Sequence, residues 1–277
     1  MDNAREAAMF SIKDFSSYTG TTPATLRYYD EIGLLPPAAR DTNNYRYYRP
    51  FQIMTLNFIK VLTDLGVPLA KIKKMTKHRT PQGMIELLRA QEEILDAEFR
   101  RLQTAYSILH TFRKNIHSGL SAEEGFIGVK DLDEARLIEG PPNEFGDIGS
   151  FYSAFIGFCN SADKYRINLR YPVGGMYAGM GSFMRSPSEP ERFFSADPCG
   201  NARRPAGKYL VGYQRGFYGQ FGDLPGKLDA YAKENGLACE RPVYSLYLLD
   251  EVSVDAPDGY LAEVTVGVKK ARASRWG

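Results

Sequence analysis

Residues 80–118 form one long amphipathic pattern, and it limits the possible folds more than any other feature of the sequence. Apolar residues recur every seven positions, at Leu88, Leu95, Leu102, Leu109 and Ile116. The other core position of the heptad holds Ile85, Phe99 and Tyr106, and Glu92 and Arg113 interrupt it. At about 1.5 Å per residue the predicted helix is roughly 57 Å long. We expect it to pair with a second copy of the chain, because the sequence offers no other helix of that length; packing within one chain is the alternative.

Composition excludes several classes of protein. Of the 277 residues, 43% are hydrophobic and 25% charged, unlike a disordered or collagen-like chain. Because there is no run of eighteen apolar residues and no signal-peptide pattern, we expect a cytoplasmic protein with no membrane partner. At about 100–200 residues per domain, the length predicts two domains.

Charge and aromatic residues divide unevenly along the chain. Residues 1–119 carry 17 Lys and Arg against 12 Asp and Glu, whereas residues 120–277 carry 18 against 21. The aromatic residues divide 13 to 22. A basic first part and an aromatic, slightly acidic second part indicate two kinds of partner.

Caps mark two short helices near the N-terminus. Ser11 and Thr22 stand at N-cap positions, with Pro23 at the first position of the second helix. Gly20 and Gly33 supply the left-handed residue that ends each helix. Two helices joined by a short glycine-containing turn predict a helix-turn-helix.

The second helix and the segment beyond it carry candidate DNA contacts. We expect Arg27, Tyr28 and Tyr29 on its exposed and half-exposed surface, where guanidinium and hydroxyl groups reach phosphates or base edges. Residues 45–49 are aromatic and basic with strand propensity, which favours a DNA-gripping wing over a solvated loop. The candidate DNA-binding residues are Thr22, Thr25, Arg27, Tyr28, Tyr45, Arg46, Tyr47 and Arg49.

Two further helices are predicted over residues 51–65 and 68–77. The last carries Lys71, Lys73 and Lys74, which we expect mainly on a solvated face rather than at the DNA backbone.

These residues resemble a known family. The segments TLRYYDEIGLL (25–35), YRYY (45–48) and LGVPL (65–69) closely resemble the MerR family of transcription regulators, over residues 9–78. The resemblance implies an all-α winged helix-turn-helix in a bacterial, nucleoid-associated homodimer. It also implies a pseudo-palindromic operator in double-stranded promoter DNA between the −35 and −10 elements, with RNA polymerase as a further partner.

The long helix over residues 80–118 is then the dimerisation element. The resemblance implies an antiparallel coiled coil, which the heptads alone do not specify. The candidate dimerisation residues are Leu88, Leu95, Phe99, Leu102, Tyr106 and Leu109.

Neither a cofactor nor a metal site is predicted. Cys159, Cys199 and Cys239 lie forty residues apart without a C-x-x-C pair. The metal-sensing branch of the family uses cysteines near the end of the long helix, where this sequence has only His110 and His117.

Residues 120–277 predict an α+β domain of two similar strand-helix-strand-strand blocks. The first has strands over 135–139, 168–171 and 177–183 and a helix over 148–158. The second has strands over 208–215, 243–249 and 260–268 and a helix over 224–234.

This part resembles GyrI-like effector domains, as found in the BmrR-type multidrug-sensing subgroup. In that subgroup, an aromatic pocket with a buried glutamate holds lipophilic cations. Here Ser245 stands where that acid is expected, so the effector is a small lipophilic molecule that is neutral or anionic unless Glu263, Glu251 or Asp250 turns inward. The candidate effector-binding residues are Tyr152, Phe155, Tyr171, Phe193, Tyr218, Phe221, Ser245, Tyr247 and Glu263.

The sequence thus predicts an effector-responsive transcription regulator, an activator that distorts promoter DNA, rather than an enzyme. No phosphate-loop or nucleophile-elbow motif is present, and no catalytic residue is assigned. Two alternatives remain for residues 120–277. Some GyrI-like relatives resemble hydrolases with a Tyr–Glu pair, for which Glu263 is the candidate acid, and the domain could instead bind a protein.

Overall fold

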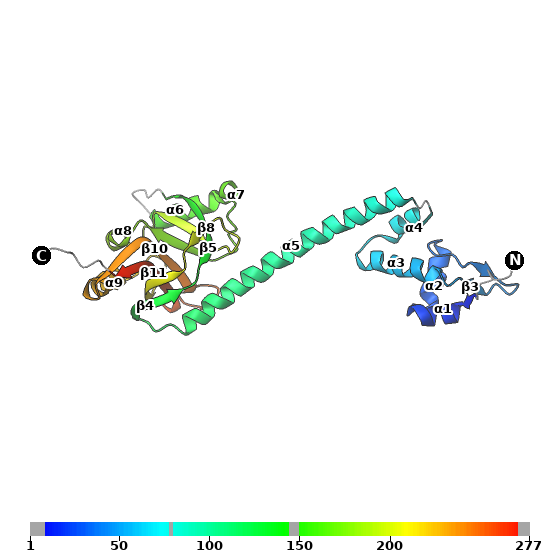
Figure 1. The fold of residues 1–277 in the computed structure, drawn as a ribbon, viewed down its shortest axis with the longest axis horizontal. Helices are drawn as coiled ribbons and strands as arrows, with labels where there is room; N and C mark the ends of the chain where they lie inside the picture. The colour runs from blue at the N-terminus through cyan, green and yellow to red at the C-terminus, as the bar shows by residue number, and fades with distance from the viewer. Residues whose placement is uncertain (1–8, 78–79, 144–149, 271–277) are drawn as a thin grey trace. The chain divides into compact units, whose positions relative to one another are not determined.

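The computed structural model describes residues 9–77, 80–143 and 150–270 and divides into two compact units, residues 1–100 and 101–277. His78 and the first two residues of the predicted helix 148–158 fall outside the described ranges. Figure 1 traces the elements along the chain. The first unit contains β1 (Phe10–Ser11), α1 (Ile12–Thr19), α2 (Pro23–Glu31), β2 (Ala39–Arg40), β3 (Arg46–Tyr48), α3 (Gln52–Asp64) and α4 (Leu69–Lys77).

The predicted caps of the first two helices are confirmed. The Ser11 hydroxyl accepts the amide of Asp14 at 3.2 Å, and Thr22 Oγ1 accepts the amide of Thr25 at 3.1 Å. Gly20 has φ 58° and Gly33 has φ 67°, the left-handed conformation that glycine adopts without strain.

The core of the first unit lies between its helices and its small sheet, whose strand order is β1-β3-β2. Tyr48 of β3 is buried and stacks on Phe15 of α1, with 4.6 Å between ring centroids. Leu26, Leu56 and Ile59 are also fully buried. The wing strands therefore pack onto the helices through an aromatic residue of their own.

Helix α5 (Pro81–Leu120) is a single helix of 40 residues, and its residues fall in both units. The Thr80 hydroxyl accepts the amide of Gly83 at 3.1 Å, as expected of an N-cap. The helix continues two residues beyond the predicted end at residue 118, to Leu120. Gly119 instead allows close packing: a Cβ there would lie 2.7 Å from Leu249 Cγ.

The second unit is built on an antiparallel sheet with the strand order β4-β9-β11-β10-β6-β7-β5-β8. Its elements are β4 (Ile127–Leu132), β5 (Ala135–Pro142), α6 (Ser150–Asn160), α7 (Ala162–Tyr165), β6 (Val173–Tyr177), α8 (Met180–Arg185), β7 (Arg192–Ser195), β8 (Ala202–Arg204), β9 (Gly207–Arg215), α9 (Leu224–Glu234), β10 (Leu237–Leu249), the 3₁₀ turn Pro257–Gly259 and β11 (Leu261–Lys270).

The two predicted blocks are present as the series β5-α6-β6-β7 and β9-α9-β10-β11. In the sheet, the second block has the order β9-β11-β10 and the first has the order β6-β7-β5, so that equivalent strands are arranged symmetrically about the β10–β6 pair. The pair joins Ser245 to Gly175. The pseudo-symmetric α+β architecture is confirmed.

Two predicted strands of the first block are wrong. Residues 168–171 form a turn, in which the Asn168 side chain accepts the amide of Arg170 at 3.2 Å and its carbonyl accepts the amide of Tyr171 at 3.1 Å. Strand β6 ends at Tyr177, and Met180–Arg185 is helical.

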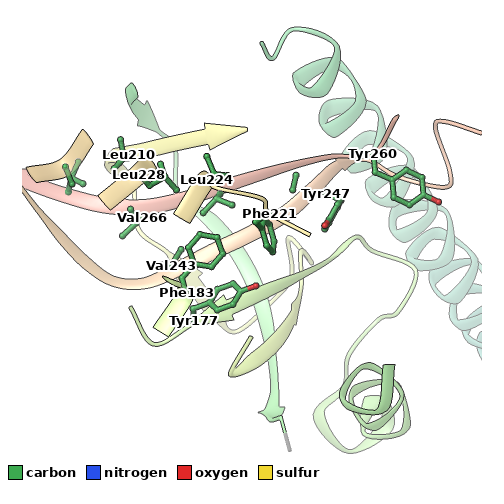
Figure 2. Packing of buried hydrophobic residues seen from close by; sticks show 14 residues of the cluster. Tyr177, Phe183, Leu210, Phe221, Leu224, Leu228, Val243, Tyr247, Tyr260 and Val266 are labelled. Carbon is green, nitrogen blue, oxygen red and sulfur yellow. The ribbon is translucent and has the colours of Figure 1, made fainter. Parts of the chain in front are cut away.

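The two faces of the sheet have different coverings. Successive residues of a strand point to opposite faces, so Val243 and Tyr247 of β10 pack with α8 and α9 in the core drawn in Figure 2. Tyr244 and Leu246, on the other face, line a cavity beside the last turns of α5.

Candidate functional site

Helix α2 presents two candidate DNA contacts and buries a third residue. Arg27 and Tyr28 are exposed, but Tyr29 is only 7% exposed and packs in the core, so its expected exposure is wrong. Leu26 and Tyr29 are three residues apart and lie on the same side of the helix, which is the side facing the core. Thr22 and Thr25 stand at the start of α2, with 2.8 Å between their hydroxyls.

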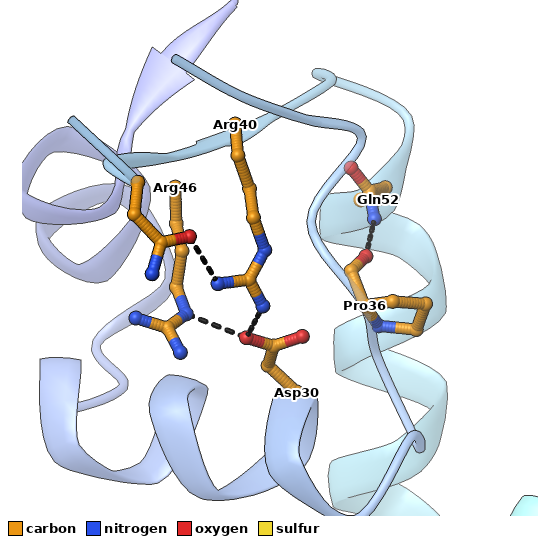
Figure 3. Close-up of polar contacts among 6 residues, drawn as sticks. Asp30, Pro36, Arg40, Arg46 and Gln52 are labelled. Carbon is orange, nitrogen blue, oxygen red and sulfur yellow. Dashed lines mark hydrogen bonds and ion pairs between the residues drawn. The ribbon is translucent and has the colours of Figure 1, made fainter. Parts of the chain in front are cut away.

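A carboxylate on α2 holds two arginines of the wing. Asp30 Oδ2 accepts hydrogen bonds from Arg46 Nε at 2.6 Å and Arg40 Nη2 at 2.5 Å (Figure 3). Arg40 Nη1 also donates to Asn44 Oδ1 at 2.9 Å. The predicted site residues did not include Asp30, Arg40 or Asn44. A sequence feature that could have identified this group is an acidic residue, Asp30, one helical turn after Arg27 in an otherwise basic segment. Two guanidiniums are thereby fixed beside the exposed end of α2.

The remaining wing residues differ in exposure. Tyr45 is 63% exposed and Arg49 is exposed, whereas Tyr47 is half-buried. Burial, followed by the charge of Asp30, raises the pKa of the neighbouring Tyr48. A row of hydroxyl and guanidinium donors therefore runs along the wing.

The basic residues of α3 and α4 have other environments. Lys60 Nζ donates to the carbonyl of Thr19 at 2.9 Å, a structural contact within the first unit. Lys71 and Lys74 are exposed, in agreement with a solvated face.

The heptad stripe of α5 stays uncovered within the chain. Its exposed residues range from 38% for Leu88 to 71% for Tyr106. Ile116 differs, because it packs against the buried residues of β9, β10 and β11. The full list of exposed stripe residues is Ile85, Leu88, Leu95, Phe99, Leu102, Tyr106 and Leu109.

Most candidate effector residues lie on the helix-covered face of the sheet. Tyr218 is central to them: its ring lies 4.5 Å from that of Tyr247 and 6.3 Å from that of Phe151 in α6. Phe151 and Phe155 both pack edge-on against Phe193. We name Phe151, Phe155, Phe193, Tyr218, Phe221, Tyr247 and Tyr260 the aromatic cluster.

An acid stands at the edge of the aromatic cluster. The Tyr218 hydroxyl donates to Glu251 Oε2 at 2.5 Å, and Glu251 is exposed. Asp250 is next to it, and burial raises the pKa of its carboxyl. Both residues lie in the loop after β10 rather than on a strand. Phe151 and Glu251 were outside the predicted site list.

Three candidate effector residues differ in their exposure, and of these only Phe221 belongs to the aromatic cluster. Tyr152 in α6 is 58% exposed, and Phe221 is buried between Phe183 and Tyr247. Ser245 is buried at the β10–β6 pair, where its hydroxyl lies 3.5 Å from the carbonyl of Gly175. Ser245 carries no charge. The acid that contacts the aromatic cluster is Glu251, at the edge of the cluster.

Tyr171 and Glu263 are not part of the aromatic cluster. Tyr171 is buried, and burial raises the pKa of its hydroxyl. Glu263 lies on the opposite sheet face, in a cavity of about 750 Å³, and accepts a hydrogen bond from Tyr213 Oη at 3.2 Å. Burial raises the pKa of the Glu263 carboxyl, against the opposing effect of Tyr213 and nearby cations.

The described residues contain no cluster of three or more His, Cys, Asp or Glu side chains suited to a metal ion. Cys159, Cys199 and Cys239 are all free thiols. Within the same described ranges, no helix is both long and apolar enough to cross a membrane.

Comparisons with known proteins cover both parts of the chain. Residues 10–79 match the model of the MerR HTH family regulatory protein. The Multidrug-efflux transporter 2 regulator of Bacillus subtilis (strain 168) is 26% identical over 266 residues, which are 94% of this chain and 97% of that protein. The Multidrug-efflux transporter 1 regulator of the same strain is 28% identical over 57% of this chain and 59% of that protein. A cryo-electron microscopy structure of an EcmrR–DNA complex is 18% identical, with a TM-score of 0.42, and covers 95% of this chain and 100% of that chain.

Proposed function

Because the chain belongs to the MerR family of DNA-binding transcription regulators, we propose that it is a homodimeric activator that responds to a small lipophilic or aromatic effector. Residues 9–78 bind the operator, residues 80–118 pair the subunits and residues 120–277 bind the effector. The operator is pseudo-palindromic promoter DNA between the −35 and −10 elements, where RNA polymerase also binds.

The observation that carries this proposal is the basic surface formed by α2 and the wing. Arg27 and Tyr28 are exposed on α2, and Asp30 orients Arg46 beside them. A guanidinium that is already held in place loses less side-chain entropy when it meets a phosphate. The exposed α5 stripe supports the dimer, since an uncovered apolar row of this length favours a partner helix.

The aromatic cluster supports the choice of effector. Its rings offer flat apolar surfaces, and the Tyr218 hydroxyl and Glu251 place polar groups at its edge. We propose that a flat aromatic molecule stacks on the exposed ring of Tyr152 at the edge of this cluster. Glu251 supplies the counter-charge if that molecule is a cation. The similarity of this chain to two regulators of multidrug-efflux transporters supports a small-molecule effector.

The effector acts by shifting an equilibrium between two conformations of the DNA-bound dimer. It favours the conformation that bends and untwists the promoter, so that RNA polymerase meets both elements in line. Its influence equals the difference between its affinities for the two conformations.

Operator binding tests the DNA-binding part of the proposal. Fluorescence anisotropy with the chain's own upstream promoter fragment should show that Arg27→Ala weakens binding by about 10–100-fold, because a base or phosphate contact contributes about 1–3 kcal/mol. Lys227→Ala, in the second unit, is the control and should leave affinity unchanged. Equal affinity of Arg27→Ala and wild type contradicts the assignment.

Dye binding tests the effector part. A panel of cationic and neutral aromatic dyes should bind the wild type, and Tyr152→Ala should weaken most of the panel. Tyr165→Ala, a partly exposed tyrosine in α7, is the matched control. If both variants bind the panel as the wild type does, the aromatic cluster is not the effector site.

A hydrolase with a Tyr–Glu pair is not favoured by the geometry. Tyr213 does contact Glu263, but burial and that carboxylate raise the pKa of the Tyr213 hydroxyl. The hydroxyl thus keeps its proton and is a poor nucleophile. Mass spectrometry of the dyes after incubation with the protein should find them unchanged.

A further inference from the structure

Two unsatisfied donors line the cavity that contains Glu263. Among the described residues, only Tyr48 Oη, Asn115 Nδ2 and Arg204 Nε are buried side-chain nitrogen or oxygen atoms without a hydrogen-bond partner. The last two both line this cavity, although they come from α5 and β8. A buried donor without an acceptor costs about 1–3 kcal/mol, so two such side chains in the walls of one cavity favour a small side-chain shift toward a group that supplies acceptors.

The rest of the guanidinium of Arg204 is held in place. It lies over the ring of Tyr209 with 5.0 Å to the centroid, and its Nη1 lies 3.5 Å from Thr265 Oγ1. Its Nη2 lies 3.4 Å from the carbonyl of Asp133. Nε is the one nitrogen of this guanidinium that is left without a partner.

The charge around Glu263 favours an anion over a cation. Arg204, Lys130 and Lys114 all act on this one carboxylate, which also accepts the Tyr213 hydroxyl. The acid is therefore already compensated, and the cations exceed it.

Acids at the mouth of the cavity have partners of their own. Asp131 pairs with Lys208 at 3.2 Å and Glu134 with Arg203 at 3.6 Å. Two lining acids remain, Asp133 and Glu263, against the three lining bases Lys114, Arg136 and Arg204.

The remaining walls suit an apolar body of limited size. Phe194 projects from β7, and Tyr244 and Leu246 project from β10. The cavity of about 750 Å³ is within the range of sites for small organic molecules. The wall formed by α5 adds hydroxyls from Ser107 and Thr111.

We propose that this cavity is a second ligand site, and that it takes a small organic anion whose carboxylate or similar oxyanion accepts hydrogen bonds from Arg204 and Asn115. The apolar body of the anion lies against Phe194 and Leu246. The site is independent of the aromatic cluster, which lies on the opposite face of the sheet, and it brings a ligand into direct contact with α5.

Three ligands of one shape test the charge preference without any mutation. Naphthoate, naphthylmethylammonium and naphthylmethanol carry the same ring with negative, positive and neutral groups. Isothermal titration of the full-length protein should show saturable binding of naphthoate at least about tenfold tighter than of the other two. Equal binding of all three, or no saturable naphthoate binding up to millimolar concentration, overturns the proposal.

Matched variants then locate the anion. Arg204→Met and Asn115→Leu keep the size of the side chain and remove the donor, and each should weaken naphthoate by about 10–100-fold, as expected for a charge-assisted hydrogen bond. Arg203→Met, the exposed neighbour on β8, should stay within about twofold of wild type. If Arg204→Met binds naphthoate like Arg203→Met, the proposal is wrong.

Tyr152→Ala separates this site from the aromatic cluster. It should lose dye binding and keep naphthoate binding. Loss of both in that variant assigns naphthoate to the aromatic cluster and overturns the second site, whereas loss of neither contradicts only the proposed effector site.

Discussion

At the scale of single residues, Asp30 links the two parts of the DNA-binding surface. Its carboxylate is nearly buried and accepts from both Arg40 and Arg46, so the wing arginines are positioned by a residue of α2. The carboxylate neutralises part of the basic charge of the surface, and its two ion pairs hold both guanidiniums in one orientation. An acid within a DNA-binding surface thus contributes through geometry.

Asp30→Asn tests this role. The amide keeps the shape but loses the charge, so it should weaken operator binding severalfold and destabilise the chain by about 1–3 kcal/mol, the size of hydrogen bonds to charged groups. Anisotropy and urea unfolding measure the two effects. Glu31→Gln, at the exposed next residue, is the control; equal behaviour of the two variants means that the ion pairs have no such role.

Glu263 makes stability depend on pH. Its pKa in the folded protein lies above the ordinary value of 4.5, because burial disfavours the carboxylate. The stability that the neutral form provides is complete below pH 4.5 and is lost as the pH rises through the folded pKa. Tyr213, Arg204, Lys130 and Lys114 all favour the carboxylate and reduce this loss.

Glu263→Gln should therefore gain stability relative to wild type as the pH rises from 4.5 towards neutral. The gain is about 1.4 kcal/mol for each pH unit between the folded and unfolded pKa values. Urea unfolding across this range measures it, with the exposed Glu134→Gln as control. A constant difference between Glu263→Gln and wild type at all pH values contradicts the prediction.

The exposure of polar residues on α2 could be predicted from the sequence, but the exposure of its tyrosines could be predicted only in part, because a tyrosine can lie either in the core or on the surface. Arg27 and Tyr28 are exposed as expected, but Tyr29 turned inward because it lies one turn from Leu26. Asp30 was missed because its partners lie 10 and 16 residues further along the chain. Only the folded wing brings these groups together.

At the scale of elements, the β10–β6 pair joins the two blocks of the sheet and leaves no room for a side chain at Gly174 or Gly175 of β6. A Cβ at Gly174 would lie 2.3 Å from Phe194 Cζ and 2.5 Å from the carbonyl oxygen of Ser245. These glycines lower the strand propensity of residues 173–177, which is one reason why the sequence pattern placed a strand too late, at 177–183.

Gly174→Ala and Gly157→Ala should have opposite effects. The first forces a methyl group against backbone and should destabilise the protein by about 1–3 kcal/mol or more. The second lies in α6 with nothing within 4 Å of the added Cβ, and should stabilise by up to about 1 kcal/mol through helix propensity. Thermal unfolding compares them; a stable Gly174→Ala contradicts the close packing.

Helices were easier to predict than strands. The bounds of α9 agree with the prediction in full, since its amphipathic pattern and closing glycine are local signals. The prediction of a strand over residues 168–171 was wrong because the Asn168 side chain accepts a backbone hydrogen bond that stabilises a turn. Strand propensity does not take such side-chain to backbone hydrogen bonds into account.

At the scale of the whole molecule, the uncovered stripe of α5 predicts the assembly. The double variant Leu95→Asp/Leu102→Asp should be monomeric in analytical ultracentrifugation. The free energy needed to bury two carboxylates in an apolar interface exceeds the free energy that the two leucines contribute to dimerisation. Gln103→Asp adds a charge next to the stripe and should remain dimeric. A dimeric double variant contradicts pairing through this helix.

The division of charge along the sequence agrees with this arrangement. The basic excess belongs to the part that contains the wing, and the aromatic residues gather in the part with the cluster and the cavity. The sequence could not indicate the cavity, because its walls come from α5, β8, β10 and β11, and Asn115 and Arg204 are far apart along the chain.

Gly119 fixes one end of a short span. At the last turn of α5, glycine lets the helix backbone approach the side chains of Leu248 and Leu249, while residues of the preceding turns, from Tyr106 to Ser118, line the cavity. This part of α5 is therefore tightly packed at its C-terminal end and borders a cavity over its preceding turns. In the second site proposed above, a bound anion therefore packs against the part of α5 that lies next to its anchored end.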